Sequence, residues 1–149
     1  MRSVIQRVDS AMVSIENRIV SSIRRGILIF LGVEKGDTPQ DAEYLMEKIV
    51  NLRIFEDESG KMNRSLLDIA GEIMVISQFT LLADCRKGRR PSFVQAEEPG
   101  EAKKLYEIFV SRCKDTLLHV ATGEFQAMMK IDSVNDGPVT ILLDSRKRF

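Results

Sequence analysis

The stretch that decides how the C-terminal third folds reads VNDGPVTILL, at residues 134–143. Its second half is typical of a β-strand, because β-branched and apolar residues fill positions 139–143. Gly137 and Pro138 interrupt that pattern, since proline lacks a ladder donor and occurs at strand edges, strand starts and bulges. The local sequence favours a hairpin turn at Asn-Asp-Gly-Pro. The alternative is a functional site within a strand, where a cis X-Pro bond would push the glycine carbonyl outward.

A second stretch changes abruptly from apolar to polar residues. The run IMVI at residues 73–76 predicts a short buried strand, and SQFTL at residues 77–81 follows it directly. Strand ends often carry chemistry, because the strand fixes the backbone while the following loop stays open. The alternative is a longer strand whose polar residues alternate toward solvent.

Together, the SQFT segment at 77–80 and the N-x-GPVT segment at 135–140 resemble the two signature motifs of the D-aminoacyl-tRNA deacylase family. Neither motif departs from the family's pattern. The resemblance extends over essentially the whole chain, in order and at the family's spacing, through IQRV at 5–8, LGV at 31–33, RIF at 53–55, GKMN at 60–63 and RPSF at 90–93.

The resemblance implies an enzyme that hydrolyses the ester bond of D-aminoacyl-tRNA, and also of mischarged glycyl-tRNA, as a chiral proofreading step in translation. It implies a homodimer in which the segment carrying Gly137 and Pro138 enters the partner's active site and rejects L-amino acids. It also implies that a hydroxyl of the substrate's terminal ribose helps to activate the attacking water.

Composition predicts one domain over residues 1–149, with enough apolar residues (44%) to bury a core. Equal numbers of acidic and basic residues give zero net charge, so the whole molecule will not attract nucleic acid indiscriminately. Contact with tRNA must then use local basic segments, although such segments are commonly just solvated. The candidates are Arg86, Lys87, Arg89 and Arg90, with the tail at 146–148.

Several classes of site find no support. Cys85 and Cys113 lie in no metal-like spacing, and Cys113 falls on the apolar face of a predicted helix. His119, the single histidine, lies outside both motifs and is interpreted as a strand-end residue. We therefore expect no metal and no nucleotide cofactor. Without a signal peptide or membrane span, we expect a cytoplasmic protein.

The pattern of the chain predicts an α+β fold. One helix opens at Thr38-Pro39, with a hydroxyl N-cap followed by proline at the first helical position, and a second helix follows Pro99-Gly100. Their apolar stripes are Ala42, Leu45, Met46, Ile49 and Val50, and Ala102, Leu105, Tyr106, Phe109, Cys113, Thr116 and Leu117. Strands are expected at 4–8, 12–15, 19–23, 26–33, 73–76, 119–122, 127–134 and 139–143. The resemblance implies a mainly antiparallel, barrel-like sheet with both helices packed outside.

The candidate site is poor in acid–base side chains, so oxyanion stabilisation would come from backbone N–H groups of Ser77–Thr80 and the Gln78 amide. Thr80 is the one candidate nucleophile, but it lacks a neighbouring base, and its other role is to fix the loop. Phe79 and Phe93 could stack on the terminal adenine, and Phe79 could equally be core.

The rival hypothesis is a non-catalytic RNA-binding barrel that recognises the tRNA acceptor end. A binding module of that kind needs exposed aromatic side chains along its strands and a basic face. The chain has no Trp and only two Tyr, and its net charge is zero, so composition weighs against it.

Overall fold

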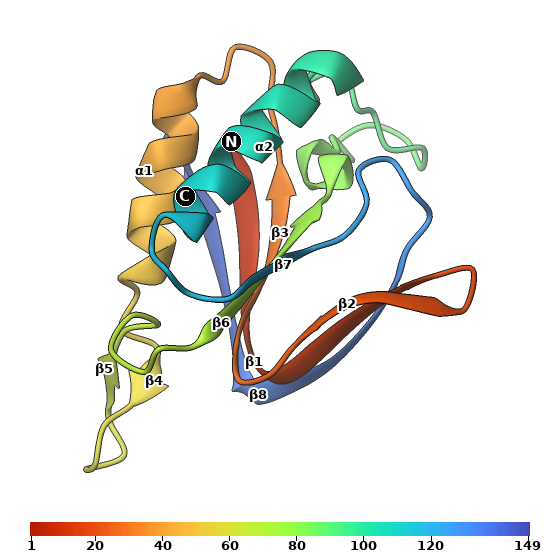
Figure 1. Cartoon of the computed structure of the whole chain (residues 1–149). Coiled ribbons are helices and arrows are strands. Elements are labelled where there is room, and N and C mark those ends of the chain that lie inside the picture. Colours follow the sequence, from red (N-terminus) through yellow and green to blue (C-terminus); the bar gives the residue numbers. More distant parts are fainter.

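The computed structural model describes residues 1–149, and its sheet is organised around one long strand (Figure 1). Strand β1 (Arg2–Ile15) pairs antiparallel with β8 (Lys130–Asp144) along one side. Along the other side it pairs antiparallel first with β3 (Gly26–Gly32) and then with β2 (Arg18–Ile23). A continuous 14-residue strand can serve three neighbours because each of its two edges offers its own row of backbone groups.

The sheet continues from β3 with parallel pairing and curls toward closure. Strand β6 (Glu72–Ser77) lies parallel to β3, and β7 (Val120–Thr122) lies parallel to β6. Strands β2 and β7 lie at the two ends of the strand order β2-β1-β3-β6-β7, and where they approach each other the Ser21 hydroxyl of β2 donates a 2.7 Å hydrogen bond to the Thr122 carbonyl of β7. The sheet is therefore mixed and nearly closed into a barrel, which confirms the expected barrel-like fold in a single domain.

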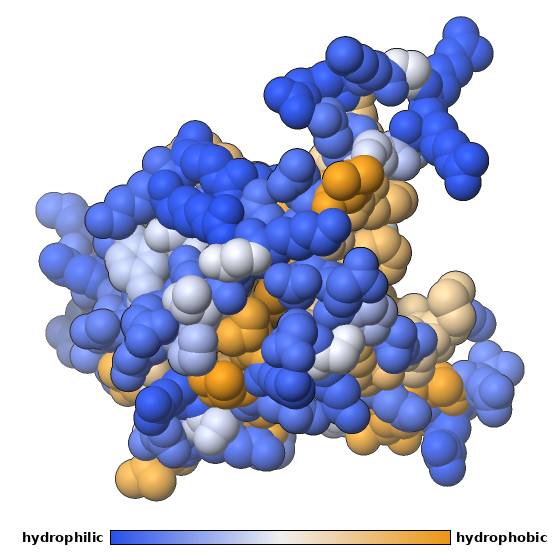
Figure 2. Space-filling view, turned by 90° about the horizontal axis from the view of Figure 1, so that it is seen from above, coloured by the Kyte–Doolittle hydropathy of each residue, from blue (hydrophilic) through white to orange (hydrophobic).

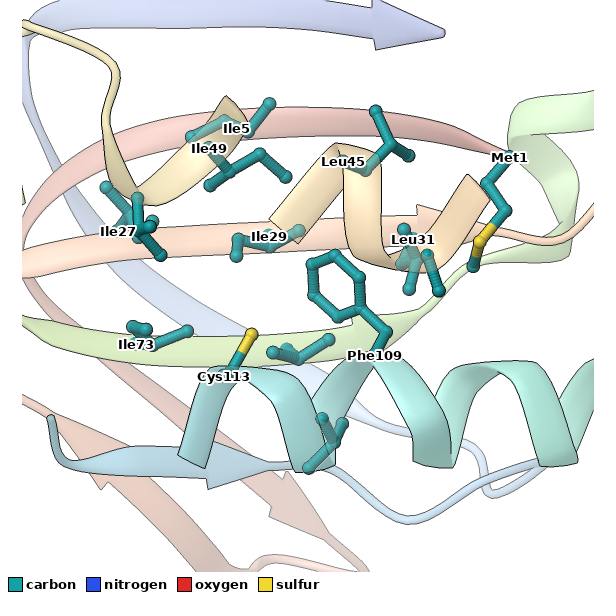
Figure 3. Close-up of a cluster of buried hydrophobic side chains, with 14 of the residues drawn as sticks. Met1, Ile5, Ile27, Ile29, Leu31, Leu45, Ile49, Ile73, Phe109 and Cys113 are labelled. Carbon is teal, nitrogen blue, oxygen red and sulfur yellow. The ribbon is translucent and has the colours of Figure 1, made fainter. Parts of the chain in front are cut away.

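Two apolar cores lie on opposite faces of the sheet. Helices α1 (Pro39–Val50) and α2 (Pro99–Lys114) cover the outer face, where Leu45 and Phe109 gather over Ile29 (Figure 3). Inside the curl, Leu28 and Met74 belong to a second core. Alternate residues of β3 and β6 thus enter different cores, which is why their sequences read as continuous apolar runs.

Both helices begin where the sequence indicates. Thr38 precedes α1, and its backbone N–H donates to the Asp41 carboxylate at 2.9 Å. Cys113 of α2 is fully buried, and this burial raises the pKa of its thiol to about 12. The expectation that the α2 stripe runs on to Leu117 is wrong. The helix ends at Lys114, and Leu117 has a φ of 65° and is 94% exposed, since a left-handed residue cannot continue the helix.

The C-terminal strand differs most from expectation. The local sequence favoured two strands separated by a turn, whereas β8 is one strand that bulges at Gly137 and Pro138. Its pairing passes from Asn135 opposite Val8 to Thr140 opposite Gln6, so residues 136–139 have no regular partner. The long edge of β1 supplies pairing partners on both sides of the interruption, and this outweighs the local turn preference.

The remaining elements are short. Strands β4 (Phe55–Glu56) and β5 (Met62–Arg64) form a separate two-stranded hairpin. A 3₁₀ turn, η1 (Phe79–Leu82), follows β6. None of the helices has the length and apolarity needed to cross a bilayer.

Candidate active site

The SQFT segment forms a turn that lies against the end of the sheet. We call residues 77–82 the strand-end turn: Ser77 is the last residue of β6, and η1 completes it. The Gln78 N–H donates to the Leu31 carbonyl at 2.8 Å. Gly32 makes the close approach feasible, because a Cβ there would lie 2.5 Å from Leu82 Cδ2 and 2.9 Å from the Gln78 carbonyl oxygen.

The strand-end turn borders a cleft of about 680 Å³. Ser77, Gln78 and Phe79 line one part of it, and Phe93 and Met129 belong to the predominantly apolar remainder. Seen from above, apolar side chains reach the surface of the molecule between strongly polar ones (Figure 2). A largely apolar cleft with a few polar groups at one end is the usual form of a small-ligand site.

Phe79 is a cleft residue and not a core residue. Its side chain is 56% exposed, and its ring meets that of Phe93 edge to face, with 5.1 Å between the ring centroids. The alternative that Phe79 is core is therefore wrong. The exposed Phe79 and the half-buried Phe93 together offer an aromatic surface along the cleft.

The side chains of Gln78 and Thr80 contact each other. The Gln78 amide donates a hydrogen bond to the Thr80 hydroxyl, and both residues are accessible to solvent. No carboxylate or imidazole contacts the Thr80 hydroxyl. The single histidine lies elsewhere, because the His119 carbonyl accepts from the N–H of Ile73 at the opposite end of β6. This arrangement gives Thr80 no general base.

The GPVT segment is held by side chains from other elements. We call residues 135–140 the bulge; within it Gly137 has a φ of 119° and its peptide bond to Pro138 is cis. The buried Arg7 guanidinium lies 2.9 Å from the Asp136 carboxylate and donates to the Ile54 carbonyl at 2.6 Å. Gly137 and Pro138 remain exposed.

Three residues around the bulge escaped the sequence analysis as functional candidates. Arg7 and Asp136 form the ion pair, and the Asn135 side chain accepts from the Val139 N–H at 3.2 Å. A usable signal existed for Arg7, because it is a charged residue at a position whose neighbours alternate into the core. Its partners could not be predicted from the sequence, because they lie more than 40 residues away along the chain.

One chain does not bring the two signature segments together. The bulge lies opposite Arg7, and the register passes from Arg7 through Ile27 to Ile73, which is four residues before Ser77. Four residues along a strand correspond to roughly 13 Å, and the three strand spacings from β8 to β6 add roughly 14 Å across the sheet. Within a single chain, the bulge and the strand-end turn are therefore separate surfaces.

The basic segment forms an exposed arm beyond the strand-end turn. We call residues 84–92 the basic arm; Asp84 and Ser92 close its base with backbone hydrogen bonds of 2.7 and 2.9 Å. Hydrogen bonds from Arg86 to the Asp84 carboxylate hold the pKa of that carboxyl well below its usual range. Because Arg86 is paired in this way, the unpaired charges of the basic arm are those of Lys87, Arg89 and Arg90.

The basic tail at 146–148 is not the free charge that the sequence suggested. Arg148 pairs with Glu34, and Arg146 lies 3.0 Å from the Asp37 carboxylate. Burial would raise the pKa of Glu34, but hydrogen bonds and charge from Arg148 outweigh it and lower that pKa. These arginines fasten the C-terminus to the loop after β3, and Lys147 is the only basic residue of the tail that forms no ion pair.

Comparison with known proteins places this arrangement in a family. The family model described as D-Tyr-tRNA(Tyr) deacylase matches residues 4–144. The D-aminoacyl-tRNA deacylase of Syntrophus aciditrophicus is 60% identical over 149 residues, the full length of both chains. That of Clostridium tetani is 57% identical, also over the full length of both.

Two solved structures share the fold. One, described as c-Myc DNA Unwinding Element Binding Protein, is 40% identical, has a TM-score of 0.91 and covers 97% of this chain and 98% of that chain. The other is described as a probable eukaryotic D-amino acid tRNA deacylase. It is 16% identical, with a TM-score of 0.81 over 95% of this chain and 97% of that chain, and its likeness concerns the fold alone.

Proposed function

Because the chain belongs to the D-Tyr-tRNA(Tyr) deacylase family, we propose that it hydrolyses the ester bond of D-aminoacyl-tRNA and of mischarged glycyl-tRNA, and that it acts in the cytoplasm. The observation that carries the proposal is the strand-end turn, which presents backbone and amide groups at the end of a cleft of about 680 Å³. Turnover of the ester releases tRNA and a free amino acid, which amounts to chiral proofreading in translation.

In this proposal the strand-end turn stabilises the transition state. Attack of water on the ester carbonyl places negative charge on its oxygen, and N–H groups fixed in advance stabilise that charge without titrating. The Phe79 N–H and the Gln78 amide are donors on residues that line the cleft, and the Thr80 N–H is the next donor along the turn. The vicinal hydroxyl of the substrate's terminal ribose assists the attacking water, and Thr80 orders the turn.

We further propose a homodimer with a composite pocket. The bulge and the strand-end turn are apart in one chain, yet both are exposed, so the bulge of one subunit can complete the cleft of the other. In a two-fold dimer the same exchange occurs twice. The exposed Gly137 and Pro138 would then occupy the direction in which an L side chain projects. Glycine has no side chain for the bulge to exclude, so glycyl-tRNA also fits the pocket and is hydrolysed.

Contact with the tRNA backbone is assigned to the basic arm. Lys87, Arg89 and Arg90 are exposed and free of ion pairs, whereas Arg86 is engaged by Asp84. The arm adjoins the cleft through Phe93, which brings its charges near the chain that leads to the scissile ester. Phe79 and Phe93 are proposed to stack on the terminal adenine.

A binding function without catalysis is the second candidate. It is favoured by the 40% identical structure, whose description names a DNA-unwinding-element-binding protein. Zero net charge and a single small basic arm weigh against a protein whose main task is to hold nucleic acid.

Turnover separates the two functions. The protein, at one hundredth of the substrate concentration, is incubated with D-tyrosyl-tRNA, glycyl-tRNA or L-tyrosyl-tRNA, and remaining aminoacyl-tRNA is measured over time. The proposal expects many turnovers with the first two substrates and none with the third. Binding of tRNA without release of amino acid would instead establish the rival function.

A further inference from the structure

The strand-end turn has one side-chain anchor outside its own sequence. The Arg2 guanidinium donates from Nη1 to the Leu81 carbonyl of η1 at 2.9 Å. Apart from the bond between the Gln78 and Thr80 side chains within the turn, the other hydrogen bonds that fix it run between main-chain groups, such as Gln78 N–H to Leu31 and Ala83 N–H to Thr80. Arg2 thus adds a charged donor at the end of the turn opposite Ser77.

The sheet places Arg2 where it can reach that carbonyl. In the pairing of β1 with its neighbours, Arg2 lies directly opposite Gly32 on one side and Asp144 on the other. Register partners project to the same face of a sheet, and Gly32 has no side chain there. The strand-end turn packs directly against Gly32, so the Arg2 side chain, which lies beside Gly32 on the same face, is next to the turn.

The opposite side of the guanidinium is fixed by a buried carboxylate. Arg2 Nε and Nη2 both lie 3.4 Å from Asp144 Oδ2, and the Asp144 side chain is fully buried. Asp144 also accepts from the Arg146 N–H at 2.8 Å and lies 3.5 Å from Arg148 Nε. The Phe149 ring lies over the guanidinium, 5.5 Å from its central carbon. Arg2 is consequently only partly accessible, and its planar guanidinium is held in one orientation.

We propose that Arg2 is a positioning residue, held by Asp144, that sets the position of the strand-end turn and hence of its oxyanion-stabilising N–H groups. The catalytic part of this inference rests on the function proposed above. Arg2 does not line the cleft, so it acts through Leu81. Its effect should fall on kcat and leave KM nearly unchanged, because the displaced donors matter most where charge develops.

The test compares Arg2→Met with Arg2→Lys and Asp144→Asn. Arg2→Met keeps a long apolar stem and removes the donors; we expect a loss of kcat of about tenfold or more with D-tyrosyl-tRNA, since small displacements of catalytic groups are costly. Arg2→Lys keeps the charge and a single donor nitrogen and should recover part of the loss. Asp144→Asn should fall between Arg2→Met and the unaltered protein.

Arg24→Met is the matched control, because Arg24 also forms an ion pair, with Glu72, but at the opposite end of β6. Rates are measured well below each variant's melting temperature. A wild-type kcat for Arg2→Met, an effect confined to KM, or an equal loss in Arg24→Met would overturn the inference.

A second measurement does not depend on activity. Backbone amide resonances of residues 78–81 are compared by NMR in the unaltered protein, Arg2→Met and Arg24→Met. The inference requires shifts at these amides in Arg2→Met only, and unmoved resonances would refute the positioning role. If the unaltered protein released no amino acid, the proposed function would fail while the amide shifts still decided whether Arg2 positions the turn.

Discussion

The strand-end turn and the bulge carry the two signature motifs, yet they are held in place in different ways. The strand-end turn is fixed mainly by main-chain hydrogen bonds and by its fit against Gly32. The bulge is fixed by side chains, through the buried Arg7 and the Asn135 amide. The strand-end turn should therefore tolerate changes in most of its own side chains and fail when its backbone is displaced, whereas the bulge depends mainly on particular side-chain partners.

The largest effect is expected from displacing the strand-end turn. In Gly32→Ala the new Cβ would overlap Leu82 and the Gln78 carbonyl, at 2.5 and 2.9 Å, so the turn must move. We expect kcat with D-tyrosyl-tRNA to fall by about a hundredfold. Gly100→Ala is the control, because nothing lies within 4 Å of a Cβ there. Equal activity of the two variants would break the comparison.

A tenfold-scale effect is expected at the bulge. Gly137→Ala puts a side chain at a φ of 119°, 2.8 Å from Val139 Cγ2 and 3.2 Å from the Arg7 guanidinium. We expect D-aminoacyl-tRNA cleavage to fall by about tenfold, or L-tyrosyl-tRNA to become a substrate, because the bulge shifts. Initial rates with both tyrosyl-tRNAs measure this.

Combining the two glycine variants in one dimer tests whether each pocket joins the strand-end turn of one subunit to the bulge of the other. A heterodimer of Gly32→Ala and Gly137→Ala subunits would contain one pocket built from an intact strand-end turn and an intact bulge. Co-expressed subunits carrying different tags and purified through both should therefore regain close to half the normal activity. No recovery in a confirmed heterodimer would mean that each pocket uses segments of a single chain.

A smaller effect is expected in the basic arm, which continues from the strand-end turn. Replacing Lys87, Arg89 and Arg90 together with Ala should raise KM by several fold and leave kcat unchanged. The slope of log(kcat/KM) against log salt should become shallower by roughly 2, because about three phosphate contacts are lost. Arg86→Ala should change KM less, since Arg86 is paired with Asp84. An unchanged salt slope in the triple variant would remove the arm from the tRNA interface.

The smallest effect is expected at Thr80. Its hydroxyl accepts from the Gln78 amide and contacts no base, so Thr80→Ala should retain kcat within about threefold. Single-turnover rates with D-tyrosyl-tRNA give the value directly. A fall of several orders of magnitude in a folded variant would make Thr80 a nucleophile and would show that the strand-end turn does more than present its backbone.

The sequence anticipated the elements and segments whose signals are local. The helix after Thr38, the strand at 26–33 and the turn after Ile76 each follow from residues within one short window. Local signals failed where a distant strand supplied the deciding partner. The hairpin turn expected at Gly137 gave way to one continuous strand because β1 pairs with β8 on both sides of the bulge.

By itself, then, the sequence determined the fold class, the two signature segments and the family, since apolar periodicity, capping residues and ordered motifs are written in the chain. The tertiary structure was needed to show that the two segments lie apart in one chain and that the tail arginines form ion pairs with Glu34 and Asp37. It also showed that Arg7 supports the bulge and that Arg2 supports the strand-end turn. The physical reason is that a charged side chain takes its role from the partner it meets. Those partners lie between 47 and 129 residues away for Arg7, and 79 residues away for Arg2 at Leu81.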